Sequence, residues 1–276
     1  GVIGAITPST NPTSTIICNA IGMLAAGNAV VFCVHPLARA CSMETVALLN
    51  AAITQAGGPR NLVTCLSDPS IETAQEVMRH PLIRLLVVTG GGAVVQAAMA
   101  SGKRAICAGP GNPPAVVDET AHLDKAGRDI VLGASTDNNI ICVDEKEVLV
   151  VDGVADALLT AMQAAGAVVI EPSRLTALEN LIFAKHPGPR GHAVMNHDLI
   201  GKNASAILSR IGMNVPESTR LGVVQVDEDH PLLWSEQMMP ILPVCRMPDA
   251  DRAITMAIAM EGGNRHTAVM RSTHLD

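Results

Sequence analysis

Hydrophobic and polar residues alternate in blocks along the first half of this 276-residue chain. Short apolar runs predict strands, and a stretch with the helical spacing of apolar residues follows nearly every one. The predicted strands cover residues 2–6, 29–34, 62–66, 82–88 and 104–108, and the predicted helices cover residues 13–26, 41–56 and 71–79, with a fourth ending at residue 99. Several strands are apolar throughout, which is typical of strands buried on both faces. The pattern predicts an α/β fold with a doubly wound parallel sheet.

The second half repeats this alternation with different spacing. Its predicted strands cover residues 147–151, 221–226, 241–246 and 267–270, and its predicted helices cover residues 122–132, 156–165, 174–182 and 250–260. We therefore expect two α/β domains, at residues 1–113 and 114–276. The segment 185–196 is rich in Gly, Pro, His and basic residues. It predicts a solvated surface loop, and a loop beside an anionic ligand is the alternative.

Composition narrows the functional classes. No apolar stretch approaches the ~20 residues of a membrane-spanning helix, and the net charge of −7 has its signs interspersed, without a basic face for nucleic acid or an anionic membrane. The seven cysteines are odd in number and form no CxxC pair, so we expect neither a disulfide framework nor a metal site. Free thiols of this kind fit a protein of the reducing cytoplasm. The chain opens on a strand-like run without an initiator Met. We expect it to be truncated at both ends.

Ligands of a parallel sheet bind beyond the carboxyl ends of its strands. In this chain those segments are residues 7–12, 35–36, 67–69, 89–92 and 109–114. Gly90, Gly91 and Gly92 open a helix, where backbone amides can approach a phosphate. The third position of a GxGxxG fingerprint falls on Val95, however, and glycine after a strand often serves turn geometry alone.

The stretch 133–146 carries the strongest candidate for chemistry. Small and amide-bearing residues lead to a single cysteine, Cys142, and the apolar run of a strand follows. A thiol in a loop before a strand can be partly exposed, and donors from Asn138, Asn139 and backbone amides would favour its thiolate. The alternative is that Cys142, flanked by Ile and Val, is a small buried hydrophobe.

Six segments together resemble the aldehyde dehydrogenase superfamily, in order and approximate spacing. They are GVIGAITPSTNP at 1–12, AAGNAVVFCVHP at 25–36, VVTGGG at 87–92, GPGNPP at 109–114, the Cys142 window and SEQMMP at 235–240. The resemblance covers essentially the whole chain and is greatest to CoA-acylating aldehyde dehydrogenases, the acetaldehyde and propionaldehyde type associated with bacterial microcompartments. It implies an aldehyde dehydrogenase-like fold, with a Rossmann-like dinucleotide-binding domain at residues 1–113 and a catalytic domain at residues 114–276, both partial.

The resemblance also implies roles for individual residues. Cys142 matches the nucleophile, which attacks the aldehyde to give a thiohemiacetal; hydride transfer to NAD then leaves a thioester. Glu236 matches the glutamate that holds the nicotinamide ribose. The segments lining the dinucleotide match Thr7, Pro8, His35, Pro36, Thr89, Gly90 and Gly91. Simpler readings exist, because an isolated Glu is commonly a solvated surface residue and His35-Pro36 can be a mere turn.

Two departures from the hydrolytic members bear on the reaction. Their general base begins an ELGGKSP motif, and the matching position here is Ala108. General-base assistance is worth ~10²–10⁴-fold, so its absence lets the thiol of CoA compete with water for the thioester. The oxyanion-hole asparagine of the PWNFP motif is replaced by Thr10 within PSTNP. The oxyanion is then expected to depend on the Cys142 amide, with Thr10 or Asn11 as second donor.

Three functional hypotheses follow. The first is a CoA-acylating aldehyde dehydrogenase that uses NAD and CoA on a short aliphatic aldehyde, with Cys142 facing the cofactor domain across a cleft. The second is a catalytically inactive fragment that serves binding or assembly, and the third is a hydrolytic aldehyde dehydrogenase, which Ala108 disfavours. For the first, the resemblance implies a homo-oligomer in the cytoplasm or inside a microcompartment, with its shell as a partner. No nucleic acid or membrane partner is expected.

Overall fold

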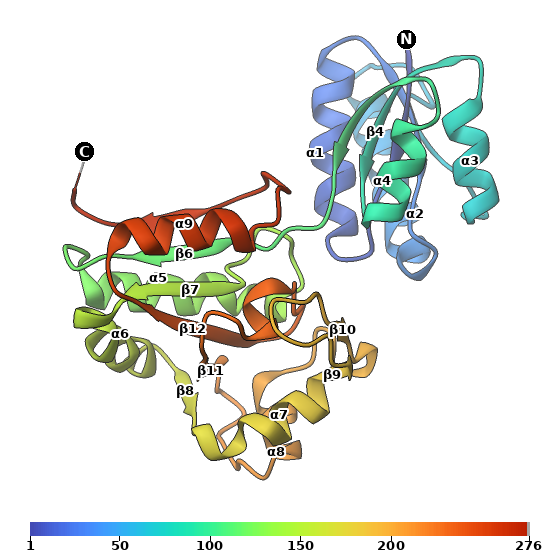
Figure 1. Ribbon diagram of the computed structural model, residues 1–276. Coiled ribbons are helices and arrows are strands. Elements are labelled where there is room, and N and C mark those ends of the chain that lie inside the picture. The colour runs from blue at the N-terminus through green and yellow to red at the C-terminus, as the bar shows by residue number, and fades with distance from the viewer. Residues whose placement is uncertain (275–276) are drawn as a thin grey trace. The chain divides into compact units, whose positions relative to one another are not determined.

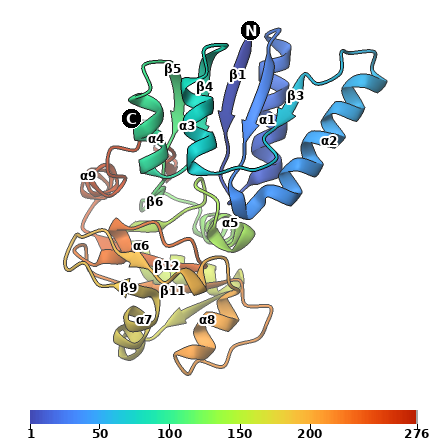
Figure 2. The same ribbon diagram turned by 90° about the vertical axis from the view of Figure 1, so that its right-hand side faces the viewer.

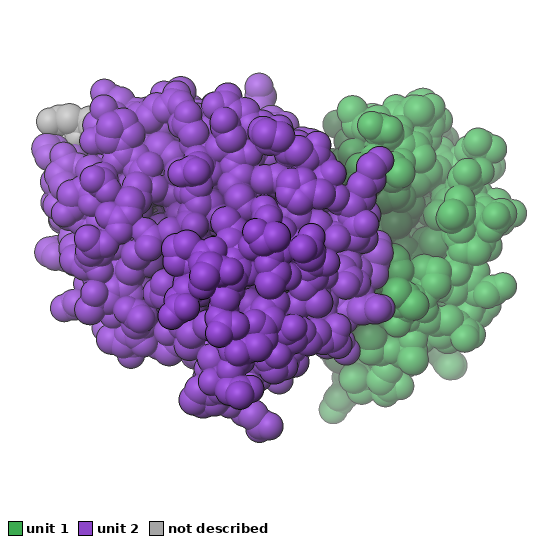
Figure 3. All heavy atoms as spheres, turned by 60° about the horizontal axis from the view of Figure 1, so that its bottom comes forward, with its two compact units in different colours: residues 1–110 green, residues 111–276 purple. Residues whose placement is uncertain are grey.

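The computed structural model describes residues 1–274 and divides into two compact units, Gly1–Pro110 and Gly111–Asp276 (Figure 3). The sequence placed the boundary between residues 113 and 114, and the division falls between 110 and 111. The side chain of Asn112 explains the difference, because it is buried and hydrogen-bonded to Glu147 and to other residues of the second unit. Among the helices of residues 1–274, none is long and apolar enough to cross a membrane.

The first unit is a five-stranded parallel sheet in the order β3-β2-β1-β4-β5, with helices on both faces (Figures 1 and 2). Its strands are β1 (Val2–Ile6), β2 (Ala29–Cys33), β3 (Val63–Cys65), β4 (Ile83–Thr89) and β5 (Arg104–Ala108). Its helices are α1 (Pro12–Ala25), η1 (Pro36–Ala38), α2 (Arg39–Gln55), α3 (Ile71–Arg79) and α4 (Gly92–Met99). The predicted doubly wound parallel sheet is confirmed.

Alternation along the strands gives this sheet two cores. Ile3 and Ala5 of β1 pack with Phe32 against α1 and α2. Ile6, the next residue along β1, packs with Leu86 into the other core, against α3 and α4. Successive side chains of a strand point to opposite faces, so apolar residues at consecutive positions fit a sheet covered on both sides.

The second unit is a six-stranded parallel sheet in the order β13-β6-β7-β12-β11-β8. Its strands are β6 (Pro114–Val117), β7 (Glu147–Val151), β8 (Ala167–Ile170), β11 (Leu221–Gln225), β12 (Ile241–Met247) and β13 (Val269–Arg271). A separate antiparallel pair joins β9 (Phe183–Lys185) to β10 (Val194–Met195). The helices are α5 (Leu123–Ala134), η2 (Thr136–Asn139), α6 (Asp152–Ala164), η3 (Pro172–Arg174), α7 (Leu175–Ile182), η4 (His197–Leu199), α8 (Ala204–Arg210), η5 (Pro231–Trp234) and α9 (Ala250–Met260).

The apolar faces of these helices cover the second sheet. Helices α5 and α6 share one core with the strands, and Ile130 and Leu158 lie fully inside it. Helix α9 covers the opposite face through Met256 and Met260. The sequence did not predict β6, β8, β9, β10 or α8, because runs of two to seven residues are too short to show a period.

Candidate active site

Cys142 lies in the loop between η2 and β7, as predicted, and its side chain is half-buried. The loop reverses through three consecutive residues in the left-handed region, Asp137, Asn138 and Asn139, with φ of 47°, 55° and 64°. Asn and Asp adopt this conformation more easily than other residues with a Cβ. The amide-rich sequence before the cysteine is therefore explained by backbone geometry.

The two asparagine side chains do not solvate the thiol. Asn138 Nδ2 donates to the carbonyl oxygen of Gly201 at 2.9 Å. Asn139 Nδ2 donates to the carbonyl oxygen of Ala134, at the end of α5, at 2.8 Å. The prediction that these amides stabilise a Cys142 thiolate is wrong, because their donors are used to fasten the loop.

The fastening is completed by Lys146, a residue whose importance the sequence did not reveal. Its side chain is fully buried, and Nζ donates to Asn139 O at 2.6 Å, Asn139 Oδ1 at 2.8 Å and Ile141 O at 3.1 Å. Three oxygen acceptors require three N–H donors, which only the protonated ammonium supplies. A buried cation is thus hydrogen-bonded to the backbone of the cysteine loop. Lys146 is the last residue of the stretch 133–146, and its sequence context gave no sign of this role.

The surroundings of Cys142 oppose ionisation of its thiol. Burial raises its pKa above the ordinary value of 9.0, and the nearby carboxyl of Glu236 raises it further. The Cys142 backbone amide and the Lys146 ammonium lower this pKa, and Asp144 adds a small rise. The thiolate expected from the sequence is therefore a minor form at neutral pH. Lys146 is the one cation among the groups that shift this pKa.

Glycine is required at position 111, where the chain passes against the cysteine. A Cβ at Gly111 would lie 2.5 Å from the carbonyl oxygen of Cys142 and 3.3 Å from the ring of His266. The backbone amide of Gly111 also lowers the pKa of Glu236. Gly111 therefore touches both the cysteine loop and the segment that carries the glutamate, which the GPGN motif alone did not indicate.

Glu236 is half-buried beside these groups and is not a solvated surface carboxylate. Burial raises its pKa, while Lys146 lowers it. The segment before it is held by the loop between β9 and β10. In that loop the Ala193 amide donates to Ser235 Oγ at 2.8 Å, and the Arg190 guanidinium lies 5.5 Å from the centre of the Trp234 ring. Residues 186, 189, 190 and 192 of this loop are exposed, as predicted for a solvated loop, and the loop also contacts the segment that leads to Glu236.

A buried polar cluster ties three distant segments together behind the site. Asn112 Nδ2 lies 3.2 Å from Glu147 Oε1, 3.0 Å from Leu233 O and 3.1 Å from Met260 O. Burial raises the pKa of Glu147 well above its ordinary value, which favours the neutral acid. Since Asn112 follows Gly111, this cluster fixes the turn that touches Cys142. A single Asn in a proline-rich turn carries no sequence signal for such a role.

The predicted dinucleotide-lining residues lie in the first unit, where parallel strands end at one edge of the sheet. The chain runs from β1 to β2 and β3 on one side and returns to β4 on the other, so the crevice between β1 and β4 is the ligand position of such folds. Thr7, directly after β1, is buried, and its Oγ1 has no partner within the described residues. Gly91 caps α4, and no heavy atom lies within 4 Å of where its Cβ would be. A free hydroxyl and an open helix N-terminus suit a phosphate or ribose.

Other predicted residues of this unit have local partners. His35 Nδ1 accepts from the Leu37 amide at 3.2 Å, which is the turn considered as the simpler alternative. Pro36, the first residue of η1, continues that turn, and Pro8 follows Thr7 after β1. Thr10 Oγ1 donates to Asn11 Oδ1 at 3.2 Å. Their roles toward a dinucleotide or an oxyanion stay predictions.

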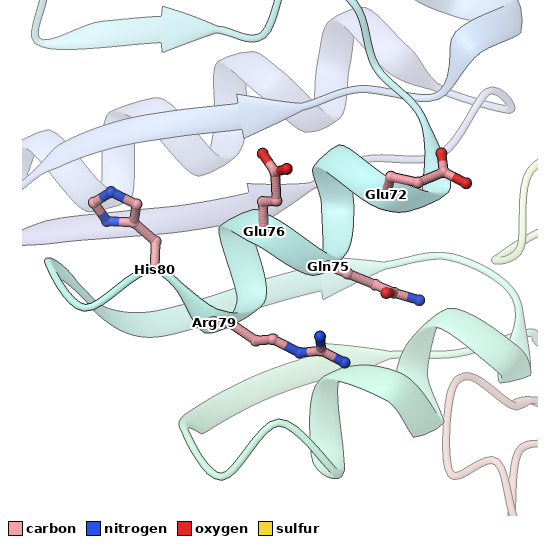
Figure 4. Close-up of a pocket in the computed structure, with 5 residues that line it drawn as sticks. All are labelled: Glu72, Gln75, Glu76, Arg79 and His80. Atoms are coloured by element: carbon pink, nitrogen blue, oxygen red, sulfur yellow. The ribbon is translucent and has the colours of Figure 1, made fainter.

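A pocket along α3 is unrelated to this chemistry. It is lined by Glu72, Gln75, Glu76, Arg79 and His80, all from one helix and the residue that follows it (Figure 4). Gln75 and Arg79 extend to the same side of the helix, whereas Glu72, Glu76 and His80 point elsewhere, and the five side chains do not converge on a common point. Within residues 1–274, no group of three metal-ligating side chains occurs.

The whole length of this chain is similar to known proteins. The sequence profile of the "Aldehyde dehydrogenase family" matches residues 1–184. An acetaldehyde dehydrogenase (acetylating), EutE, of Salmonella typhimurium is 48% identical over 277 residues, which are 100% of this chain and 59% of that protein. The chain thus spans about three fifths of the length of this curated relative.

Two solved structures are similar to this chain. A Rhodopseudomonas palustris propionaldehyde dehydrogenase, crystallised with CoA and an acylated cysteine, is 48% identical with a TM-score of 0.93, covering 100% of this chain and 62% of that one. A propionaldehyde dehydrogenase from the fucose utilisation microcompartment of Clostridium phytofermentans is 44% identical with a TM-score of 0.92, with coverages of 100% and 62%.

Proposed function

Because this chain belongs to the aldehyde dehydrogenase family, we propose that it forms the cofactor-binding and catalytic parts of a CoA-acylating aldehyde dehydrogenase. The substrate is a short aliphatic aldehyde, propionaldehyde or acetaldehyde, the electron acceptor is NAD, and the product is an acyl-CoA. The observation that carries the proposal is a half-buried cysteine beside Glu236 and Lys146, in a chain with alanine where hydrolytic relatives carry their base.

The first step is attack on the aldehyde by the Cys142 thiolate. A C–S bond forms, and the electron pair of the C=O π bond moves to the oxygen, which becomes an oxyanion. The Cys142 amide lowers the pKa of its own thiol, so this N–H lies close to the sulfur, beside the carbon whose oxygen becomes the oxyanion. It is the first candidate donor, and Thr10 or Asn11 is the proposed second.

The dinucleotide supplies the hydride acceptor when it is bound. Thr7, Thr89, Gly90 and Gly91 would hold its phosphates and ribose at the carboxyl edge of the first sheet, with Pro8, His35 and Pro36 lining it. Glu236 would accept hydrogen bonds from the nicotinamide ribose. The raised pKa of Glu236 is offset by Lys146, which favours the ionised form that accepts such bonds.

The last step releases the acyl group from Cys142. The CoA thiolate attacks the thioester carbon, a new C–S bond forms, and the Cys142 sulfur leaves with its bonding pair as a thiolate. Ala108, the last residue of β5, has no carboxylate with which to deprotonate a competing water. The missing base favours the thiol of CoA over water.

Following NADH formation with aldehyde, with and without CoA, tests the proposal. CoA-dependent turnover is expected. Turnover that is independent of CoA and yields free acid would indicate a hydrolytic enzyme. No turnover by a folded sample would favour the second hypothesis, a binding or assembly module.

The setting of the protein belongs to the same proposal. The relative from a microcompartment motivates placing this enzyme in the cytoplasm or inside such a compartment, as a homo-oligomer that contacts the shell. Sedimentation of the purified protein and copurification with shell proteins test the two parts separately.

A further inference from the structure

The proposed reaction uses Lys146 only through its effect on the pKa of Glu236. The Lys146 side chain is fully buried, however, and it is hydrogen-bonded to the backbone of the cysteine loop. Burying a lysine is costly unless its charge is used and its donors are satisfied. All three donors are satisfied here, by oxygens of residues 139 and 141.

We propose that Lys146 is a positioning residue that holds the backbone before Cys142 in its left-handed turn and supplies the positive charge that makes the Cys142 thiolate accessible. This role deepens the proposed function. It rests on that function only for the step that the thiolate performs, the attack on the aldehyde. The three hydrogen bonds of Lys146 Nζ end on Asn139, whose φ is 64°, and on Ile141, the residue directly before Cys142. Without the ammonium, the two buried Asn139 oxygens would lose this partner at once, and Ile141 O would keep only the Asp144 amide, at 3.1 Å.

The charges around the pair set the direction of the effect. The groups that act on the Cys142 thiol are Glu236 and Asp144, which disfavour the thiolate, and Lys146, which favours it. Burial lowers the pKa of Lys146 from its ordinary value of 10.5, and the charges of Glu236, Asp144, Cys142 and Glu147 raise it. Glu236 has the largest effect of these four, so it is the main anion that competes with the thiolate for the ammonium.

The test is the rate of Cys142 alkylation by iodoacetamide between pH 6.5 and 10.5, followed by mass spectrometry of the Cys142 peptide. In Lys146→Met the profile should move to higher pH by about one unit, which slows alkylation about tenfold at pH 8. Lys146→Arg keeps the charge and should recover most of the rate. The exposed Lys202→Met is the matched control and should leave the profile unchanged.

A folded Lys146→Met protein with the parental pH profile overturns the inference. If that variant loses its cooperative thermal transition, Glu236→Gln decides. Removing the competing carboxylate should leave Lys146 to the thiolate and accelerate alkylation at pH 8, and an unchanged rate would overturn the inference as well. Aldehyde turnover is measured on the same samples. A shifted profile without any turnover in the parent would refute the proposed function and leave the role of Lys146 standing.

Discussion

The two units differ in the polar and charged groups at their candidate binding and catalytic sites. The carboxyl edge of the first sheet has an unpartnered hydroxyl, Thr7, and open glycines, and no buried charge lies among these residues. The cysteine region of the second unit is crowded with ionisable groups, including the fully buried Lys146 and Glu147. The first arrangement leaves room and free donors for a large ligand, whereas the second fixes one sulfur atom by hydrogen bonds and charges.

Dinucleotide binding and thiol ionisation should therefore respond differently to single substitutions. A dinucleotide bound mainly through backbone and small polar groups should tolerate the loss of any one side chain, since each hydrogen bond contributes only about 0.5–1.5 kcal/mol. A thiol whose ionisation depends on a few close charges should respond strongly to each of them. Five substitutions, from the largest expected effect to the smallest, test this difference between the two units.

Cys142→Ala should reduce aldehyde oxidation to background and abolish alkylation of the peptide that contains position 142. The other thiols are not placed for the reaction: Cys245 is buried in the core of the second unit, and Cys107 lies on β5. Cys107→Ala and Cys245→Ala are the controls and should keep most of the activity. Turnover retained by Cys142→Ala would remove the proposed nucleophile.

Glu236→Gln should slow single-turnover hydride transfer by up to about 10²-fold, with a smaller change in dinucleotide affinity. The glutamine keeps the shape but loses the charge that would orient the ribose, and misorientation is costly for a reaction that requires near-attack geometry. Stopped-flow absorbance of NADH measures the rate, and titration of the dinucleotide measures the affinity. An equal loss in both would mean that Glu236 only binds.

Ala108→Glu should increase the release of free acid from the acylated enzyme, by less than the ~10²–10⁴-fold range of general bases. The new carboxylate must also reach the water, and the neighbouring Pro110 restricts the backbone. Free acid formed per acyl-enzyme in the absence of CoA measures the gain. If a structure of the variant shows the glutamate and a water beside Cys142 without faster hydrolysis, selectivity for CoA has another origin.

Thr7→Val should weaken dinucleotide binding about threefold to tenfold and leave the free energy of unfolding unchanged or slightly higher. The hydroxyl has no partner among residues 1–274, so its loss should remove only a bond to the ligand. Calorimetric titration and thermal unfolding measure the two quantities. Thr45→Val, at a buried hydroxyl that donates to Cys41 O at 2.8 Å within α2, is the control, with lower stability and unchanged affinity. Destabilised Thr7→Val with parental affinity would contradict the ligand role.

Glu147→Gln should make stability less dependent on pH. Because the folded pKa of Glu147 is raised above its ordinary value of 4.5, the folded state holds a proton that the unfolded chain releases above that pH. The free energy of unfolding of the parent therefore falls as pH rises, by up to about 1.4 kcal/mol per pH unit between the two pKa values. The variant lacks this loss, so its advantage in melting temperature should grow from pH 5 to pH 8. A constant difference would show that Glu147 is ionised in the folded protein.

The sequence by itself determined the fold of the first unit. Its strands are apolar on both faces and its helices are long enough to show their period, so element type and order follow from local physics. It also determined which cysteine lies in a loop before a strand and that no carboxylate occupies position 108. The sequence did not predict the short elements β8 and α8, because each has too few residues to show a periodic pattern.

The tertiary structure alone decided what surrounds that cysteine. The amides of Asn138 and Asn139 were expected to face the thiol, and they fasten the loop instead, because Gly201 and Ala134 present carbonyl acceptors to them. The cluster of Asn112 and Glu147 joins residues that are 35 apart in the chain, and Asn112 and Met260 are 148 apart. Contacts of this kind leave no trace in local periodicity. The ionisation of Cys142 depends on them, because a pKa is set by burial and by neighbouring charges in space.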